Sequence, residues 1–313
     1  MQPEIIAIGE PMLEFNAEQE GALSEVGRFV VGWGGDTSNF CIAACRAGGR
    51  VGYLTRLGDD EFGESFLKLW QREGIDTSRV VRDPDAFTAA YFISRKGRQH
   101  YFTYFRRGSA ASRMAPAFLP HDYIAGAGLL HVSGISQAIS QSACDTVFAA
   151  IAVARAAGRL VSYDPNFRPK LWPLDRARAV IHETCRRADL IFPSLDDARQ
   201  LTGLVSPEEI AGFYRGLGPK VVVIKLGAEG ALLASANDLQ TFPPYAVESI
   251  DMSGAGDTFD GAFAVCFLQG RPLDECMRFA NAAAALTTTG LGCVSPVPRR
   301  EAIHALMARQ PQS

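Results

Sequence analysis

Asp251-Met252-Ser253-Gly254-Ala255-Gly256-Asp257 lies in the C-terminal third of the chain and leads directly into a helical pattern. Glycines at a helix start let bare backbone N–H groups approach an anion, and the helix dipole favours negative charge there. The carboxylate of Asp257 then falls in the first helical turn, beside that anion. An anion pocket with a proton acceptor next to it is what phosphoryl transfer to an alcohol requires. The stretch therefore predicts a catalytic site, with Asp257 as the base and Gly254, Ala255 and Gly256 as the anion hole.

Each of the two aspartates also has a simpler explanation when it is taken alone. Asp257 is a common choice for complementing the dipole in a first helical turn, and Asp251 is a common turn cap. Their joint spacing around Gly-Ala-Gly is more specific than either residue. The helix that follows suits a rigid site because one of its faces is apolar, formed by Phe259, Phe263, Cys266 and Phe267.

The composition excludes several classes of protein. The chain has 313 residues and a formal net charge of −3, so it lacks the basic excess of a general nucleic-acid binder. It has no apolar run of about 18 residues and no N-terminal signal pattern, which argues against a membrane span or secretion. Its 7 cysteines are scattered and form no CxxC pair. We expect a cytoplasmic protein that acts on a small molecule and has no nucleic-acid or membrane partner.

Short apolar runs alternate with helical patterns along most of the chain. The apolar runs cover residues 4–8, 51–54, 129–132, 160–163, 190–192 and 221–224, and the helical patterns cover residues 39–47, 60–73, 141–157, 174–187, 207–217 and 279–287. Continuously apolar strands separated by helices indicate a parallel sheet that is covered on both faces. We therefore predict an α/β fold with a mainly parallel sheet.

Two segments interrupt this alternation. Residues 12–33 and 87–112 show strand-like alternation without intervening helices, and residues 89–105 read as an antiparallel hairpin. We predict that they form a small β-sheet lid inserted into one domain that spans residues 1–313. The alternative is that these strands lie at the edge of the main sheet.

Three motifs resemble the signatures of one family. Asp251-x-x-Gly-Ala-Gly-Asp257 resembles the second signature of the ribokinase-like (PfkB) carbohydrate kinases. Gly34-Gly35-Asp36-x-x-Asn39 followed by Gly58-Asp59-Asp60-x-x-Gly63 resembles the first, and the order and spacing agree over nearly the whole chain. The resemblance implies a ribokinase-like three-layer α/β/α core with a β lid. It also implies ATP as the phosphoryl donor and Asp257 as the base that activates the sugar hydroxyl.

The resemblance also assigns residues to the two substrates. Gly35 and Asn39 fall where the family binds the sugar, although a tight turn before a helix is the simpler explanation. Lys225, Gly227 and Gly230, which follow an apolar strand, lie along the ATP phosphates and ribose by resemblance. The same comparison places Asn281 near the adenine, and Asn166 and Arg168 at the nucleotide. As bare patterns these are weaker, since glycine turns after strands and solvated helical asparagines are common.

Metal binding is less clearly encoded. Ser194-x-x-Asp197 replaces the Asn-x-x-Glu usual in the family, which is associated with effects of magnesium and phosphate. Asp197 is therefore a candidate for that role, with a shorter reach. Mg²⁺ is expected in any case, because the charge of ATP must be neutralised for in-line transfer. Asp251 is, by resemblance, a candidate site for a monovalent cation such as K⁺.

The stretch from Tyr104 to Ser112 gives the clearest indication of the sugar. It is similar to the corresponding stretch of 2-keto-3-deoxygluconate kinases, and Asp164-Pro165-Asn166-Phe167-Arg168 is a second match that Tyr91 completes. Arginines bind carboxylates in a planar, two-point manner, so Arg106 and Arg168 favour an acidic substrate. A surface arginine with its stem packed down is the simpler alternative.

We therefore expect a kinase that converts 2-keto-3-deoxygluconate and ATP to the 6-phosphate and ADP. The alternatives are a family member that acts on a neutral sugar, of the fructokinase or ribokinase type, and a non-catalytic sugar sensor that retains the fold. The resemblance also implies a homodimer or higher homo-oligomer through the lid, since an exposed sheet face or edge tends to find a partner.

Overall fold

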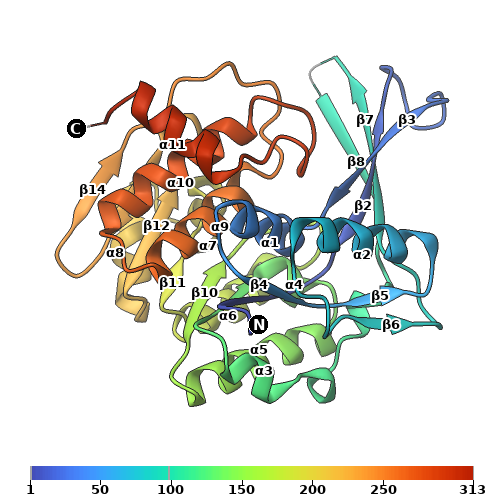
Figure 1. Ribbon diagram of the computed structural model, residues 1–313, viewed down its shortest axis with the longest axis horizontal. Coiled ribbons are helices and arrows are strands. Elements are labelled where there is room, and N and C mark those ends of the chain that lie inside the picture. Colours follow the sequence, from blue (N-terminus) through green and yellow to red (C-terminus); the bar gives the residue numbers. More distant parts are fainter. Residues whose placement is uncertain (1, 98, 313) are drawn as a thin grey trace.

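The structure, a computed structural model, describes residues 2–97 and 99–312 and, within that range, omits the side chain of His100. The main sheet has eight strands in the order β14-β13-β12-β11-β10-β9-β1-β4 (Figure 1). From β12 to β4 the strands are parallel, whereas β13 and β14 join as antiparallel strands. The strands are β1 (Ile5–Ile8), β4 (Val51–Leu54), β9 (Leu129–Ser133), β10 (Leu160–Asp164), β11 (Leu190–Ile191), β12 (Val221–Lys225), β13 (Ala231–Ala234) and β14 (Leu239–Phe242).

Helices cover both faces of this sheet and bury two separate apolar cores. Alternation along each strand divides the side chains: Ile5 and Ala7 enter one core, whereas Ile6 and Ile8 enter the other. The first core is covered by α1 (Asp36–Arg46), α2 (Glu61–Glu73), α9 (Ala255–Leu268), α10 (Leu273–Thr287) and α11 (Arg300–Arg309). The second is covered by α3 (His121–Ala125), α4 (Gly134–Ala138), α5 (Gln141–Ala156), α6 (Leu174–Cys185), α7 (Leu195–Thr202) and α8 (Pro207–Leu217). The predicted three-layer α/β/α core is confirmed.

A second, four-stranded sheet stands apart from the main sheet, with the order β3-β2-β7-β8 (Figure 1). Its strands are β2 (Met12–Ala17), β3 (Phe29–Gly34), β7 (Ala90–Lys96) and β8 (Gln99–Phe105). We call these four strands the lid sheet. They pair with one another and not with the main sheet, so they are not edge strands of the main sheet. Two short strands, β5 (Arg56–Gly58) and β6 (Val81–Asp83), form a third sheet.

Several boundaries differ from the sequence prediction. α1 begins at Asp36 rather than at residue 39, because Gly35 caps it with φ 99°, and the polar residues that follow are already helical. α10 begins at Leu273, six positions before the predicted start, after Pro272. The β13–β14 hairpin was not predicted. Short 3₁₀ turns occur at Ala111–Arg113, Pro116–Phe118 and Gly227–Glu229. Among the described residues, no helix is both long and apolar enough to cross a bilayer.

The parallel strands bring their carboxyl ends to one edge of the sheet, where open α/β sheets bind ligands. Asp164 is the last residue of β10 and Lys225 is the last residue of β12. The amino end of α9 lies at the same edge, because Lys225 contacts its side chain Asp260. α9 itself packs between α1 and α10 and is buried along most of its length, so the residues of its first turn are held rigidly.

Candidate active site

The amino end of α9 has the geometry that its sequence predicts. Gly254 caps the helix in the left-handed conformation, with φ 73°. A Cβ there would lie 2.9 Å from the carbonyl oxygen of Cys293, so both the conformation and the packing require glycine. The amide of Ala255 makes a long hydrogen bond of 3.3 Å to the carbonyl of Met252. Gly254, Ala255 and Gly256 all line the cavity described below.

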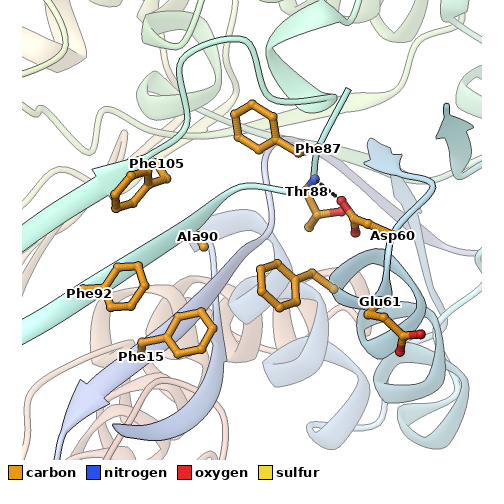
Figure 2. Close-up of a pocket in the computed structure, with 9 residues that line it drawn as sticks. Phe15, Asp60, Glu61, Phe87, Thr88, Ala90, Phe92 and Phe105 are labelled. Atoms are coloured by element: carbon orange, nitrogen blue, oxygen red, sulfur yellow. Dashed lines mark hydrogen bonds between the residues drawn. The ribbon is translucent and has the colours of Figure 1, made fainter. Parts of the chain in front are cut away.

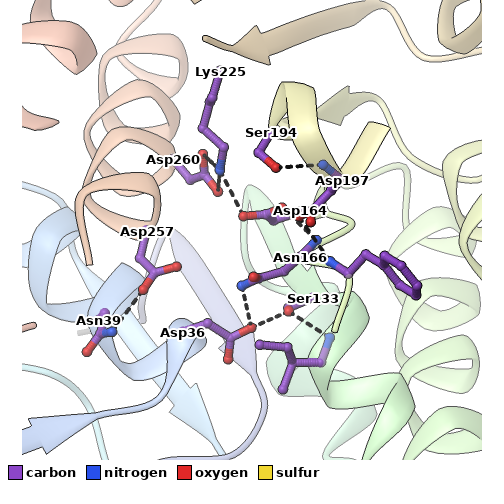
Figure 3. Close-up of polar contacts among 12 residues, drawn as sticks. Asp36, Asn39, Ser133, Asp164, Asn166, Ser194, Asp197, Lys225, Asp257 and Asp260 are labelled. Carbon is purple, nitrogen blue, oxygen red and sulfur yellow. Dashed lines mark hydrogen bonds and ion pairs between the residues drawn. The ribbon is translucent and has the colours of Figure 1, made fainter. Parts of the chain in front are cut away.

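Asp257 lies in the first turn of α9 and is held by a side chain from α1. Its Oδ2 accepts a hydrogen bond of 2.8 Å from Asn39 Nδ2 (Figure 3). Burial and, to a lesser extent, the charge of Asp36 raise the pKa of Asp257 to about 7, although the Asn39 hydrogen bond opposes both. A carboxylate with a pKa near neutrality is well matched to accepting a proton at physiological pH.

Asp36 connects this base to the ends of two parallel strands. Its Oδ2 accepts hydrogen bonds from the Ser133 hydroxyl and, at 3.2 Å, from Asn166 Nδ2 (Figure 3). Asn166 has φ 36°, which is unusual for a residue other than glycine. Asp164 Oδ1 stabilises this backbone by accepting from the Asn166 amide at 2.9 Å. The strained conformation is therefore held in place at the sheet edge that faces Asp257.

Lys225 forms the second charged cluster of the site. Its ammonium lies 2.9 Å from Asp164 Oδ2 and 3.1 Å from Asp260 Oδ1. Sequence analysis assigned Lys225 but missed Asp36, Asp164 and Asp260. A signal was available for Asp260, because it lies three residues after Asp257 and so on the same helical face.

A cavity of about 860 Å³ lies between these elements and holds much of the predicted site. The residues that were predicted from the sequence to form the site and that line this cavity are Asn166, Arg168, Asp197, Lys225, Gly227, Gly230, Gly254, Ala255, Gly256, Asp257 and Asn281. The predicted nucleotide residues and the predicted base therefore share one space. Gly35, Asn39, Tyr91, Tyr104 and Arg106 are not part of its lining.

The predicted sugar residues of the lid sheet lie together on neighbouring strands. The ring of Tyr91 is 5.9 Å from that of Tyr104, and the guanidinium of Arg106 is 5.7 Å from the ring of Tyr104. Tyr91 is buried, and its hydroxyl donates to Glu14 Oε2 at 2.5 Å. Tyr104 is partly open to solvent.

Arg106 is already paired in the structure. Its Nε donates to Glu10 Oε2 at 2.8 Å, and its Nη2 donates to the same oxygen. Ser109 completes the arrangement by donating to Glu10 Oε1 at 2.5 Å. Glu10 follows β1 in the core and its side chain is fully buried. Sequence analysis treated Arg106 as an open guanidinium and gave no role to Glu10.

Arg168 lies between the cavity and the lid sheet. Its side chain is 47 % exposed, and its Nη1 donates to the Phe167 carbonyl at 3.0 Å and lies 4.0 Å from Asp197 Oδ2. Burial raises the pKa of Tyr104, and the charges of Arg168 and Arg106 lower it. Both guanidinium groups are therefore close enough to Tyr104 for their charges to lower the pKa of its hydroxyl.

Two predicted ligand residues make protein contacts that explain their identity. A Cβ on Gly35 would lie 2.4 Å from the Glu10 carbonyl, so its glycine is needed for packing against the core as much as for approach of a ligand. Asn281 lines the cavity, but its Nδ2 donates to the carbonyls of Phe242 and Pro243. It fixes the segment after β14 that borders the cavity.

The candidate metal residues do not form a dedicated metal cage. Among residues 2–97 and 99–312, no group of three or more His, Cys, Asp or Glu side chains is arranged to hold a metal ion. Asp251 accepts from the amides of Ser253 and Gly292, each at 2.9 Å. Asp197 accepts from the Phe167 amide at 3.2 Å and faces the cavity. Asp197 is one of several carboxylates that line the cavity, and such an arrangement suits Mg²⁺ that is carried by nucleotide phosphates and retains several waters.

A second cavity, of about 550 Å³, lies on the other face of the lid sheet. Figure 2 shows phenylalanine side chains from the lid sheet and from α2 around it. Its lining is almost entirely apolar and consists of Phe15, Asp60, Glu61, Phe62, Phe87, Thr88, Ala90, Phe92 and Phe105. It shares no residue with the first cavity.

Comparison with known proteins agrees with the fold. The family model described as pfkB family carbohydrate kinase matches residues 2–300, and the chain belongs to this family. The predicted family is therefore confirmed, and the protein is an ATP-dependent sugar kinase.

Individual relatives narrow the comparison. This chain is 34 % identical to 2-dehydro-3-deoxygluconokinase of Bacillus subtilis, and the match covers 99 % of this chain and 97 % of that protein. It is 36 % identical to 2-dehydro-3-deoxygluconokinase of Thermoproteus tenax, and that match covers 97 % of this chain and 94 % of that protein. It is 32 % identical to fructokinase-1 of Oryza sativa over 97 % of both chains. A ribokinase-type protein from E. coli, solved in complex with ATP and Mg²⁺, superposes with a TM-score of 0.92 at 25 % identity and covers 98 % of this chain and 100 % of that chain.

Proposed function

We propose that this kinase transfers the γ-phosphoryl group of ATP to O6 of 2-keto-3-deoxygluconate, also called 2-dehydro-3-deoxygluconate. The reaction type rests on Asp257, a buried carboxylate with a pKa of about 7 beside the amide cradle of α9. The choice of substrate rests on the two guanidinium groups near Tyr104, because an acyclic keto acid carries a carboxylate that arginine recognises. The similarity to two 2-dehydro-3-deoxygluconokinases supports the same choice.

The site supplies each part of an in-line transfer. Asp257 accepts the proton of the O6 hydroxyl while that oxygen bonds to the γ-phosphorus. The bond from the γ-phosphorus to its bridging oxygen breaks, and the electron pair leaves with ADP. The amides from Gly254 to Gly256 stabilise the charge on the phosphoryl oxygens. Asp197, one of the carboxylates that line the cavity, would help to hold Mg²⁺ on the ATP phosphates, where the ion would neutralise phosphate charge.

Release of ADP across a panel of sugars tests this proposal. The panel contains 2-keto-3-deoxygluconate, gluconate, fructose and ribose, each with ATP and Mg²⁺. We expect kcat/KM for the keto acid to exceed that for the neutral sugars by about 100-fold, the size of one or two charge-assisted hydrogen bonds. Equal or greater kcat/KM for fructose would refute the substrate and leave the kinase chemistry intact.

One observation favours a neutral sugar as the second candidate. The charge of Arg106 is compensated by Glu10, so this arginine alone does not select for an acid. The chain is also similar to a plant fructokinase. Under this alternative, fructose would give the highest kcat/KM in the panel, and Arg168→Ala would leave that value unchanged.

We further propose that one kinase domain spans residues 1–313 and forms homodimers through the lid sheet. Apolar side chains on the cavity face of this sheet are open to solvent, including Val31 and Phe105. A second copy packed over them and over the apolar cavity of Figure 2 would remove this surface from water. Val31→Lys should then yield monomers in sedimentation, whereas an unchanged dimer would refute this interface.

We assign the protein to the reducing cytoplasm, because its cysteines are free thiols.

A further inference from the structure

Lys225 occupies a position that nucleotide binding alone does not explain. Its ammonium is enclosed by Asp164 from the end of β10 and Asp260 from α9. The side chain of Asp260 is 1 % exposed, and Asp260 follows the base Asp257 by one helical turn. The helix that carries the base therefore also carries a carboxylate that holds a cation.

The ammonium lies directly beside the anion hole. A Cβ built on Gly256 would be 3.3 Å from Lys225 Nζ, so the charge lies next to the backbone of the glycine cradle. Lys225 and Gly256 line the same cavity. An anion held by the amides of α9 would thus have the Lys225 ammonium beside it.

The hydrogen bonds of Lys225 leave capacity for a ligand. An ammonium has three N–H donors, and Asp164 Oδ2 accepts one at 2.9 Å. The two oxygens of Asp260 lie at 3.1 Å and 3.2 Å, as expected when they share one donor. Burial alone would lower the pKa of Lys225, but Asp164 and Asp260 outweigh it and raise the pKa, so the group stays charged.

We propose that Lys225 is a catalytic residue that stabilises the transferring phosphoryl group, and that Asp260, together with Asp164, positions its ammonium beside the anion hole. This inference rests on the proposed kinase function and adds the source of positive charge at the reacting group. In the transition state the charge spreads over three phosphoryl oxygens, and a cation that is already oriented stabilises it without reorganisation. Lys225 forms and breaks no covalent bond.

Replacement of the lysine tests the catalytic role. Lys225→Met should lower kcat by about 100-fold or more, the cost of losing one preorganised electrostatic group, while the KM for sugar stays within about threefold. Lys225→Arg should retain more activity than Lys225→Met because it keeps the charge. In Lys225→Ala, methylammonium should restore part of kcat, whereas tetramethylammonium, which has no N–H donor, should not.

Lys220 provides the matched control. It precedes the same strand at its opposite end, pairs with Asp189 at 3.1 Å and is 73 % exposed. Lys220→Met should leave kcat unchanged. If Lys225→Met also keeps kcat within about threefold of the wild type, or if a folded Lys225→Ala is not rescued by methylammonium, the catalytic role is overturned.

A double-mutant cycle tests Asp260. Asp260→Asn should lower kcat by about 10-fold without raising the KM for sugar, and adding it to Lys225→Met should cost nothing more, because Asp260 acts through the lysine. The double variant also removes one of the two carboxylates that Lys225→Met leaves unpaired, Asp164 being the other. Full additivity would overturn the positioning role. All arms use whichever sugar the wild type phosphorylates, so failure of the keto-acid proposal in the sugar panel remains a separate result.

Discussion

The amino end of α9 and the lid sheet differ in how they hold their functional groups. At α9 the groups are buried and interlocked: Asp257 is bonded to Asn39, and Asp260 is bonded to Lys225. On the lid sheet Tyr104 is 40 % exposed, although Tyr91 and Arg106 beside it are anchored by the buried side chains of Glu14 and Glu10. Under the proposed function, the rigid region would define the reaction type and the exposed region would define which sugar is accepted.

The two regions meet through two buried glutamates. Glu10, after β1, accepts from Arg106 at the end of β8. Glu14, within β2, accepts from Tyr91 and, at 3.8 Å, from the thiol of Cys293, whose carbonyl packs against Gly254. Burial raises the pKa of both glutamates, and the hydrogen bonds that they accept oppose this. Tyr91 of the lid sheet is therefore connected, by way of Glu14 and Cys293, to the backbone that packs against Gly254 at the start of α9.

Loss of the base should have the largest effect. Asp257→Asn keeps the shape of the side chain but cannot accept a proton, so kcat should fall by about 100- to 10,000-fold. Binding of ATP, measured by calorimetry, should change little, because the amides of α9 remain. Turnover close to that of the wild type would show that Asp257 is not the base.

The arginines of the lid region should affect substrate choice rather than turnover. Arg168→Ala should raise the KM for the keto acid by about 10- to 100-fold, as expected for a lost charge-assisted hydrogen bond. Steady-state kinetics with the keto acid and with fructose measure this. An equal loss for both sugars would remove the argument that Arg168 reads a carboxylate.

Arg106 requires a different design because of Glu10. Arg106→Ala leaves a buried carboxylate without its partner, which costs about 3–5 kcal/mol of unfolding free energy and confounds any kinetic effect. Arg106→Met combined with Glu10→Gln removes both charges and should recover most of that stability. Chemical denaturation of the single and double variants tests this. Equal destabilisation by both would show that the ion pair does not stabilise the base of the lid sheet.

The same contrast explains what could be predicted from the sequence. The parallel sheet and the Gly-Ala-Gly helix start were predictable, because they depend on apolar runs and glycines that are local in the chain. Asp36, Asp260 and Glu10 were not, because their roles depend on partners about 35 to 130 residues away: Asn166, Lys225 and Arg106. The environment of Arg106 was misjudged for this reason, since the sequence shows its charge but not the buried carboxylate that compensates it.

The pH dependence of turnover distinguishes the buried region from the exposed one. The pKa of Asp257 is about 7 in the free enzyme, so kcat/KM should fall by about tenfold per pH unit below that value as the base is protonated. Asp36 raises this pKa, so Asp36→Asn should move the acid limb about half a unit to one unit lower. Ser133→Ala is the matched control, because it removes a hydrogen bond to Asp36 but keeps the charge. An acid limb that does not move in Asp36→Asn would exclude this coupling.

The smallest expected effect is on stability, and it has the opposite sign from the effect on turnover. The pKa of Asp257 is higher in the folded protein than its ordinary value of 3.8, so the folded state binds this proton more tightly than the unfolded state. Ionised Asp257 therefore destabilises the fold above about pH 7, and this cost disappears below about pH 4. Asp257→Asn should raise the free energy of unfolding by about 1–3 kcal/mol at pH 8 and by little at pH 4, as measured by denaturation at the two pH values. Arg168→Ala, at a half-exposed side chain outside the interlocked cluster, should show no such pH-dependent gain. If Asp257→Asn were no more stable at pH 8 than the wild type, the carboxylate would not be held at an energetic cost, and the contrast between the strained catalytic region and the relaxed lid region would fail.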